Sequence, residues 1–198
     1  MTRQLSFLDS PEPANKLTSG AHTGGRQHTL RVSAEMESGR AGEHLVMADL
    51  LLNGWVAYPT SQGVPYDIAV DIGDRIIRVQ VKSTRMPKTP EALNRGTPLY
   101  VFSTRRAGKK GRRRYTTDDF DMLALVALDR RLIAYYALTD SHHDCIAIRV
   151  PGLRYGDGGS RCRYFEDAKF ELALDRVLRS QAQEDLFSSG QGINVRRA

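Results

Sequence analysis

Three polar residues around a predicted turn have the chemical types that metal-assisted attack on a phosphodiester requires. Asp67 precedes a Gly73-Asp74 turn, and Gln80 and Lys82 follow it. Gly-Asp loops of this kind are a common hairpin signal, and a hairpin centred there places Asp67 directly opposite Gln80. Because side chains alternate along a strand, Lys82 lies on the same face as Gln80. The β-carbons of opposed residues lie ~4.5–5.5 Å apart, so a carboxylate, an amide oxygen and an ammonium gather within reach of one ion.

The opposite face of the same hairpin is apolar and predicts a core surface. Its side chains come from both predicted strands and are Tyr66, Ile68, Val70, Ile77, Val79 and Val81. Alternation of this kind is typical of strands with one buried face. The polar residues are therefore expected to be held by a strand pair that is anchored in the core.

Further helices and strands are predicted from hydrophobic periodicity and turn residues. A helix is expected over residues 33–52, with Asn53-Gly54 as its stop. Its apolar side is expected to include Met36, Leu45, Ala48, Leu51 and Leu52. Strands are expected over residues 55–58, 99–103, 123–128, 132–138 and 146–150, and a last helix over 165–179.

Length and composition indicate one globular domain. The chain has 198 residues, of which 40% are apolar and 26% charged, as in ordinary soluble proteins. No apolar run approaches the ~20 residues that cross a bilayer, so no membrane partner is expected. Two cysteines do not make a disulfide framework and favour a cytoplasmic location. Polar composition predicts disordered tails over residues 1–30 and 180–198, with the domain at 31–179.

The net charge of +6 is concentrated in one short segment. Residues 105–114 hold seven basic side chains and no acidic one: Arg105, Arg106, Lys109, Lys110, Arg112, Arg113 and Arg114. Without them, acidic groups slightly outnumber basic groups in the chain. Such a cluster is typical of polyanion-binding surfaces, so nucleic acid is the expected partner. A solvated loop or a localisation-like basic run is the alternative.

The order of these residues resembles the PD-(D/E)XK nuclease superfamily. The matching stretches are Gly39-Arg40-Ala41-Gly42-Glu43 on the first helix, then Pro65-Tyr66-Asp67 and Gln80-Val81-Lys82. The likeness spans approximately residues 34–138. It is greatest to members in which Gln replaces the second acid, including a homing-endonuclease branch, with archaeal Holliday-junction resolvases more distant. The chain departs from the pattern in two ways: Tyr66 separates Pro65 from Asp67, and no long helix is evident between residues 83 and 122.

The resemblance implies an α/β fold with a restriction-endonuclease-like core, in which helices flank a mixed central sheet. It implies a metal-dependent DNA endonuclease, acting in restriction, recombination, repair or intron mobility and leaving a 5′-phosphate. Glu43, Asp67, Gln80 and Lys82 are then the expected catalytic residues. The Mg²⁺ or Mn²⁺ ion would be held by oxygens of Asp67, Gln80, the Val81 main chain and Glu43. Lys82 would contact the scissile phosphate or the attacking water.

Gln80 leaves a second function open, because a missing carboxylate is expected both in a variant active site and in an inactive one. The alternative is a non-catalytic DNA-binding or scaffold protein with a nuclease-like fold. Retention of Lys82 favours the active site. RNA as the substrate and a homodimer are also left open.

Two peptides predict a further partner. Gln4-Leu5-Ser6-Phe7-Leu8 and Gln183-Glu184-Asp185-Leu186-Phe187 resemble the short Gln-Leu-(Ser/Asp)-Leu-Phe peptides that dock on the bacterial sliding clamp. Neither is a perfect match. Both are expected to act as linear recruitment peptides outside the domain.

Overall fold

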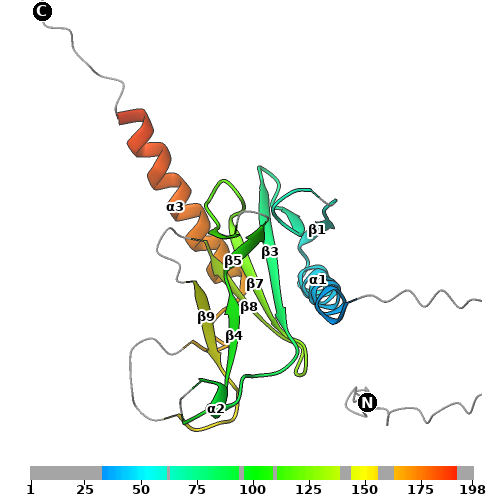
Figure 1. Ribbon diagram of the computed structural model, residues 1–198. Helices are drawn as coiled ribbons and strands as arrows, with labels where there is room; N and C mark the ends of the chain where they lie inside the picture. The colour runs from blue at the N-terminus through cyan, green and yellow to red at the C-terminus, as the bar shows by residue number, and fades with distance from the viewer. Residues whose placement is uncertain are drawn as a thin grey trace, which may run out of the picture. The chain divides into compact units, whose positions relative to one another are not determined.

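A five-stranded mixed β-sheet lies at the centre of the fold (Figure 1). In spatial order its strands are β1 (Val56–Pro59), β2 (Ile68–Asp71), β3 (Ile76–Thr84), β7 (Met122–Ala127) and β8 (Leu132–Ala137). Neighbouring strands run antiparallel except β3 and β7, which pair in parallel from Val79 opposite Met122 to Thr84 opposite Ala127. The predicted α/β fold with a mixed sheet is therefore confirmed.

Three helices and two small sheets complete the described part of the chain. The helices are α1 (Ala34–Leu52), the single-turn α2 (Pro90–Leu93) and α3 (Phe170–Gly190). β4 (Leu99–Ser103) pairs with β9 (Cys145–Arg149), and β5 (Arg105–Gly108) pairs with β6 (Gly111–Arg114). The structure is a computed structural model that describes residues 33–61, 63–93, 96–108, 111–138, 144–155 and 163–190. None of these helices is both long and apolar enough to cross a membrane.

The structure bears differently on the two predicted disordered tails. Residues 1–30 lie outside the described part of the chain. The predicted bounds of the last helix, 165–179, were wrong, because α3 begins at Phe170 and continues to Gly190. Gln181 explains part of this extension, since its side chain accepts a hydrogen bond from Arg75 and donates one to Asp121.

Hydrophobic side chains cover both faces of the central sheet. On one face α1 and α3 contribute Val46, Leu50, Phe170 and Val177, which pack with Val70, Ile77, Val79 and Met122. On the other face the β4–β9 sheet contributes Tyr100, Phe102, Ile146 and Ile148, which pack with Leu123 and Leu125. β7 lies between the two layers, so all its side chains are buried and its sequence is continuously apolar.

The predicted core face of the hairpin is confirmed at Ile68, Val70, Ile77, Val79 and Val81, which are all buried in the first cluster. The prediction was wrong for Tyr66, because this side chain packs against the second cluster on the other face. β2 begins at Ile68, so the alternation of a strand does not extend back to Tyr66.

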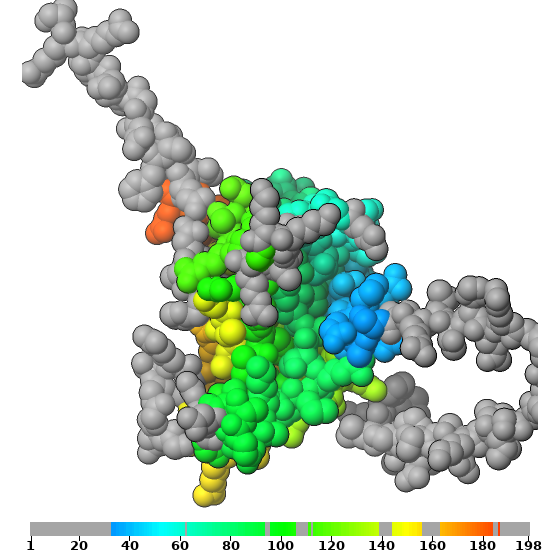
Figure 2. All heavy atoms as spheres, viewed as in Figure 1, coloured from blue at the N-terminus to red at the C-terminus, as the bar shows by residue number. Residues whose placement is uncertain are grey.

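α1 begins where predicted but buries a different side. Ser33 caps it by accepting a hydrogen bond from the Met36 amide at 3.2 Å. The buried residues are Gly42, Val46 and Leu50, spaced by four, whereas Met36 and Leu52 are 59% and 87% exposed. Gly42 decides this orientation, because a β-carbon there would lie 2.8 Å from the Ser83 β-carbon. Figure 2 shows the first turns of α1, in blue, against teal and green atoms of the middle of the chain.

Gly42→Ala is expected to lower the free energy of unfolding by about 1–3 kcal/mol, the usual cost of overpacking. Gly39→Ala is the matched control, because a β-carbon at this position of the same helix meets nothing within 4 Å. Alanine is the better helix former, so this control should be neutral or stabilising by up to about 1 kcal/mol. Urea unfolding of both variants measures the difference, and equal stabilities would contradict close packing at Gly42.

Candidate active site

The β2–β3 hairpin has the predicted register. Ile68 lies opposite Val79 and Val70 opposite Ile77. Gly73 makes the turn with a φ of +98°, in the left-handed region that glycine adopts readily. Asp67 stands one residue before β2, at the point where the ladder with β3 ends. Its side chain is therefore free to reach across to β3.

The structure brings Asp67, Gln80 and Val81 together. Asp67 Oδ2 accepts a hydrogen bond from the Val81 amide at 2.7 Å and a short one from Gln80 Nε2. Gln80 Nε2 also donates to the Val81 carbonyl oxygen at 3.1 Å. Gln80 is only 9% exposed, so its amide is held between these two oxygens. Three of the predicted metal ligands thus meet at one point.

This donor set fits a hard divalent cation such as Mg²⁺ or Mn²⁺. The Gln80 amide nitrogen stands between a carboxylate oxygen and a carbonyl oxygen, which are the ligands that these ions prefer. A half-turn of the amide would place Gln80 Oε1 at the same point, because the two ends of an amide are nearly equal in size. The described residues contain no group of three or more His, Cys, Asp or Glu suited to a metal.

Two carboxylates at this point are poorly solvated. Burial raises the pKa of Asp67, against the lowering effects of the Val81 amide, Lys82 and Gln80. Burial also raises the pKa of Glu43, and the nearby charge of Asp67 raises it further. Glu43 therefore lies close enough to Asp67 for the two charges to interact. Desolvated, mutually repelling carboxylates are typical of sites that bind a cation or do chemistry.

Lys82 points to a residue that was not among the predicted site residues. Its Nζ donates a hydrogen bond to the Tyr115 hydroxyl at 3.0 Å and lies 5.2 Å from the centre of the Tyr115 ring. The sequence places Tyr115 directly after the basic segment, but this position carries no signal of a contact with Lys82.

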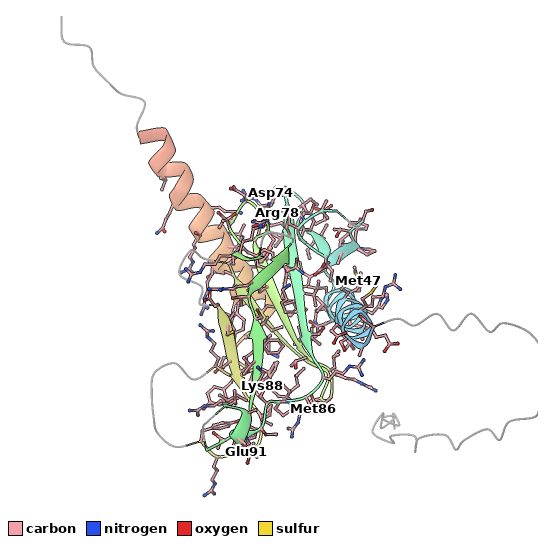
Figure 3. The ribbon with its side chains drawn as sticks, viewed as in Figure 1. Met47, Asp74, Arg78, Met86, Lys88 and Glu91 are labelled. Carbon is pink, nitrogen blue, oxygen red and sulfur yellow. The ribbon has the colours of Figure 1, made fainter. Side chains whose placement is uncertain are left out.

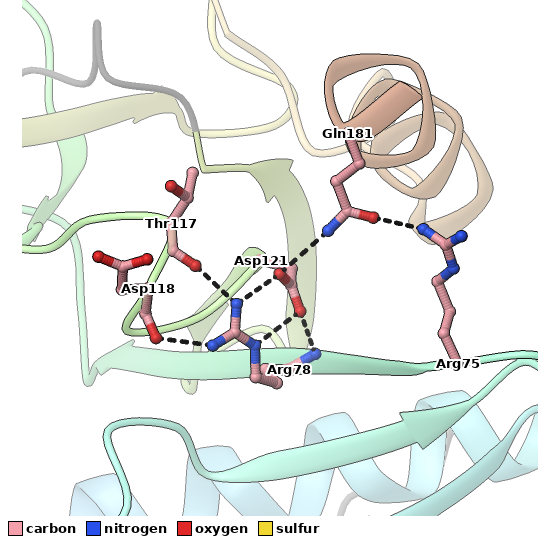
Figure 4. Close-up of polar contacts among 6 residues, drawn as sticks. All are labelled: Arg75, Arg78, Thr117, Asp118, Asp121 and Gln181. Atoms are coloured by element: carbon pink, nitrogen blue, oxygen red, sulfur yellow. Dashed lines mark hydrogen bonds and ion pairs between the residues drawn. The ribbon is translucent and has the colours of Figure 1, made fainter. Parts of the chain in front are cut away.

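Arg78 fixes the chain that carries Tyr115, the segment 115–121, against β3 (Figure 4). Its guanidinium binds both carboxylate oxygens of Asp121 at 2.8 and 3.0 Å and also donates to the carbonyls of Thr117 and Asp118. Asp121 is 5% exposed and accepts a further hydrogen bond from the Arg78 amide. This partly buried network is centred on Arg78, two residues before Gln80 on the same strand face, and the sequence did not reveal it.

The basic segment forms a two-stranded antiparallel ribbon, β5–β6. Arg105 and Arg114 both pair with Asp144, and Arg113 pairs with Asp119 at 2.8 Å. These three arginines therefore already hold carboxylate partners, which offset part of the positive charge. The side chains of Arg106, Lys109, Lys110 and Arg112 lie outside the described part of the structure.

The two clamp-like peptides give no support to the sliding-clamp prediction. Gln4-Leu5-Ser6-Phe7-Leu8 lies outside the described residues. The backbone of Gln183-Glu184-Asp185-Leu186-Phe187 is helical within α3, so this segment is not a helix-free linear peptide.

Comparisons with known proteins identify a family and a similar fold. The family model described as PD-(D/E)XK endonuclease matches residues 34–166. Among solved structures, a bacterial homing endonuclease, I-Ssp6803I, matches with a TM-score of 0.55 and 18% sequence identity over 77% of this chain and 99% of that one. A comparison with curated proteins found no match.

Asp67→Asn is expected to raise the melting temperature of the metal-free protein at neutral pH by about 2–4 °C, as about 1 kcal/mol does in a domain of this size. The variant removes a poorly solvated charge but keeps an oxygen that accepts the Val81 amide. Asp74→Asn is the control, because this exposed aspartate lies in the hairpin turn. Differential scanning calorimetry measures both variants.

The increase in melting temperature of Asp67→Asn over the wild type should depend on pH. Because the pKa of Asp67 is raised in the folded state, the folded chain binds this proton more tightly than the unfolded chain. The resulting stabilisation is complete below the unfolded-state pKa and is lost as the pH rises through the folded-state pKa. The advantage of Asp67→Asn should therefore shrink on acidification through that window. A melting temperature below that of the wild type at neutral pH would contradict the desolvation of Asp67.

Proposed function

The chain belongs to the PD-(D/E)XK endonuclease family, and we propose that it is a metal-dependent endonuclease that hydrolyses phosphodiester bonds in DNA. One observation carries the proposal: Asp67 Oδ2, the Gln80 amide and the Val81 carbonyl converge on one point of β3, next to Lys82. This arrangement gathers oxygen ligands and a cation on one edge of the hairpin.

The residues then have separate roles. A bound divalent ion supplies a Lewis acid that polarises the scissile phosphate and favours ionisation of the attacking water. Asp67, the Val81 carbonyl and Gln80 Oε1 would hold this ion, and Glu43 would add negative charge beside Asp67. Lys82 would contact the scissile phosphate and stabilise the charge that develops on its oxygens. Cleavage is expected to leave a 5′-phosphate.

Two features favour an enzyme over a scaffold that only binds DNA. Asp67 and Glu43 lie close together although burial disfavours their charges, which costs folding free energy. A protein that only binds DNA gains nothing from this arrangement. Lys82 is kept beside them, where a structural role would be served by an uncharged side chain. Gln80 lowers the negative charge of the site and favours one tightly held ion over two.

Asp67→Ala and Lys82→Ala are each expected to lower the rate of DNA cleavage by about 10²–10³-fold, the usual effect of removing one charge-stabilising group. DNA binding should persist, because neither residue lies on the β5–β6 ribbon. Lys88→Ala is the matched control, since Lys88 is an exposed lysine near α2, beyond the other end of β3 from Arg78 (Figure 3). Plasmid, branched and single-stranded DNA with Mg²⁺ or Mn²⁺ are the substrates.

Metal binding gives a readout that does not depend on cleavage. A ligand at about 100 times its dissociation constant stabilises the folded state by about 2.7 kcal/mol, so Mn²⁺ should raise the melting temperature of the wild type. It should not do so in Asp67→Ala. Cleavage that resists EDTA would contradict the metal-dependent mechanism. DNA binding without any cleavage would support the scaffold function.

The β5–β6 ribbon is proposed to supply affinity for DNA and little of the chemistry. Each phosphate contact contributes a slope of about −0.9 to log affinity against log salt on duplex DNA. Replacing Lys109, Lys110 and Arg112 with Ala should flatten this slope by about two to three and leave turnover at saturating DNA nearly unchanged. These positions are chosen because Arg105, Arg113 and Arg114 hold partners within the fold.

The control removes three exposed basic side chains from other elements: Lys88, Arg154 and Lys169. Salt titrations of DNA binding compare the two triple variants with the wild type. An unchanged slope in the ribbon variant would show that the ribbon is a solvated surface and not a DNA contact.

A further inference from the structure

We propose that Tyr115 is the positioning residue of Lys82. By two simultaneous contacts, Tyr115 holds the Lys82 ammonium toward the scissile phosphate. The inference rests on the proposed nuclease function, because it concerns how Lys82 is aimed in that reaction. It assigns a role to Tyr115, which lies outside the three motifs that identify the family.

Both contacts are made by the Nζ atom of Lys82. The Nζ donates to the Tyr115 hydroxyl at 3.0 Å, which fixes the direction of one of its N–H bonds. The same atom lies 5.2 Å from the ring centre, within the range of a cation–π interaction. A lysine side chain has four rotatable bonds and much conformational entropy to lose, so a fixed partner lowers the cost of one productive rotamer.

Tyr115 can act as a fixed partner because its own position is determined by the fold. Its ring meets the fully buried Phe120 edge-on, with centroids 4.7 Å apart. The chain between them is closed by mutual hydrogen bonds, from Thr116 N to Asp119 Oδ2 and from Asp119 N to the Thr116 carbonyl, both at 3.0 Å. At the end of the segment 115–121, Asp121 is bound to Arg78 of β3.

Both sides of the contact therefore depend on β3. Arg78 anchors the segment that presents Tyr115, and Lys82 extends from the same strand face four residues later. The phenol and the ammonium are thus both attached to one strand. A hydroxyl that accepts from Nζ leaves the other N–H bonds of the ammonium for phosphate oxygens.

The effect should appear in turnover and not in DNA affinity. Tyr115→Phe keeps the ring but loses the hydroxyl, and kcat should fall about 5- to 10-fold, as for one hydrogen bond, with KM unchanged. Tyr115→Leu loses both contacts, and its kcat should fall about 30- to 100-fold. Tyr58→Phe is the matched control, because Tyr58 is an exposed residue of β1. Melting temperatures of all variants are measured alongside.

A double-mutant cycle separates positioning from a general structural role. If Tyr115 acts through Lys82, Tyr115→Phe should slow single-turnover cleavage in the wild-type background and have no effect in Lys82→Ala. An equal fold-loss in both backgrounds would overturn the proposal. The proposal would also be overturned if the melting temperature of Tyr115→Phe fell so far that unfolded protein at the assay temperature explained the whole loss of rate.

A measurement without substrate tests the contact itself. In ¹H–¹³C NMR spectra of lysine-labelled protein, the Lys82 ε-methylene should carry a ring-current shift that Tyr115→Phe keeps and Tyr115→Leu abolishes. Absence of that shift in the wild type would overturn the proposal. If the wild type shows the shift and binds Mn²⁺ but cuts no DNA, the proposed function and the positioning role both fail. If it cuts DNA and Tyr115→Phe cuts equally well, only the positioning role fails.

Discussion

The candidate site depends on the Asp67 carboxylate, which accepts a main-chain hydrogen bond that a neighbouring strand would otherwise accept. Before the first residue of β2, the Val81 amide of β3 has no partner in the β2–β3 ladder, and Asp67 Oδ2 accepts its hydrogen bond instead. An unsatisfied buried amide is costly, so this bond holds Asp67 in place whether or not a ligand is bound. The same oxygen also accepts from Gln80. A backbone requirement of the sheet thus fixes the first member of the candidate site.

The second carboxylate reaches the same place because a helix packs unusually close to the sheet. Gly42 lies against Ser83 with no room for a β-carbon, and Glu43 is the next residue. This packing brings the Glu43 charge near Asp67: burial raises the pKa of both groups, and the charge of Asp67 raises that of Glu43 further. The fold therefore stores unfavourable electrostatic energy at the site, in the way expected where function limits stability.

Short-range patterns in the sequence were enough to predict the hairpin and its register. The Gly73 turn and the alternation on each side of it determine which residues share a face, so Asp67, Gln80 and Lys82 could be grouped correctly. The buried side of α1 could not be predicted from apolar residues alone, because a glycine makes the closest contact.

Contacts between distant parts of the chain were beyond the reach of the sequence patterns. Arg78 and Asp121 are 43 residues apart, and Lys82 and Tyr115 are 33 residues apart. The ion pairs of the basic ribbon also involve Asp144, which lies 30 or more residues away. Charge counts revealed the ribbon's composition but not these internal partners.

The parallel β3–β7 pair has a consequence for how the protein is made. A parallel pair cannot be closed by a tight turn, so β3 must wait during translation until the whole connection and β7 have left the ribosome. Until then the nascent chain exposes an unpaired edge of β3, which favours association with other chains. Asp67, Gln80 and Lys82 are synthesised early, but Tyr115 cannot be set against Lys82 before that pairing. Synthesis order therefore delays assembly of the complete site until the sheet is closed.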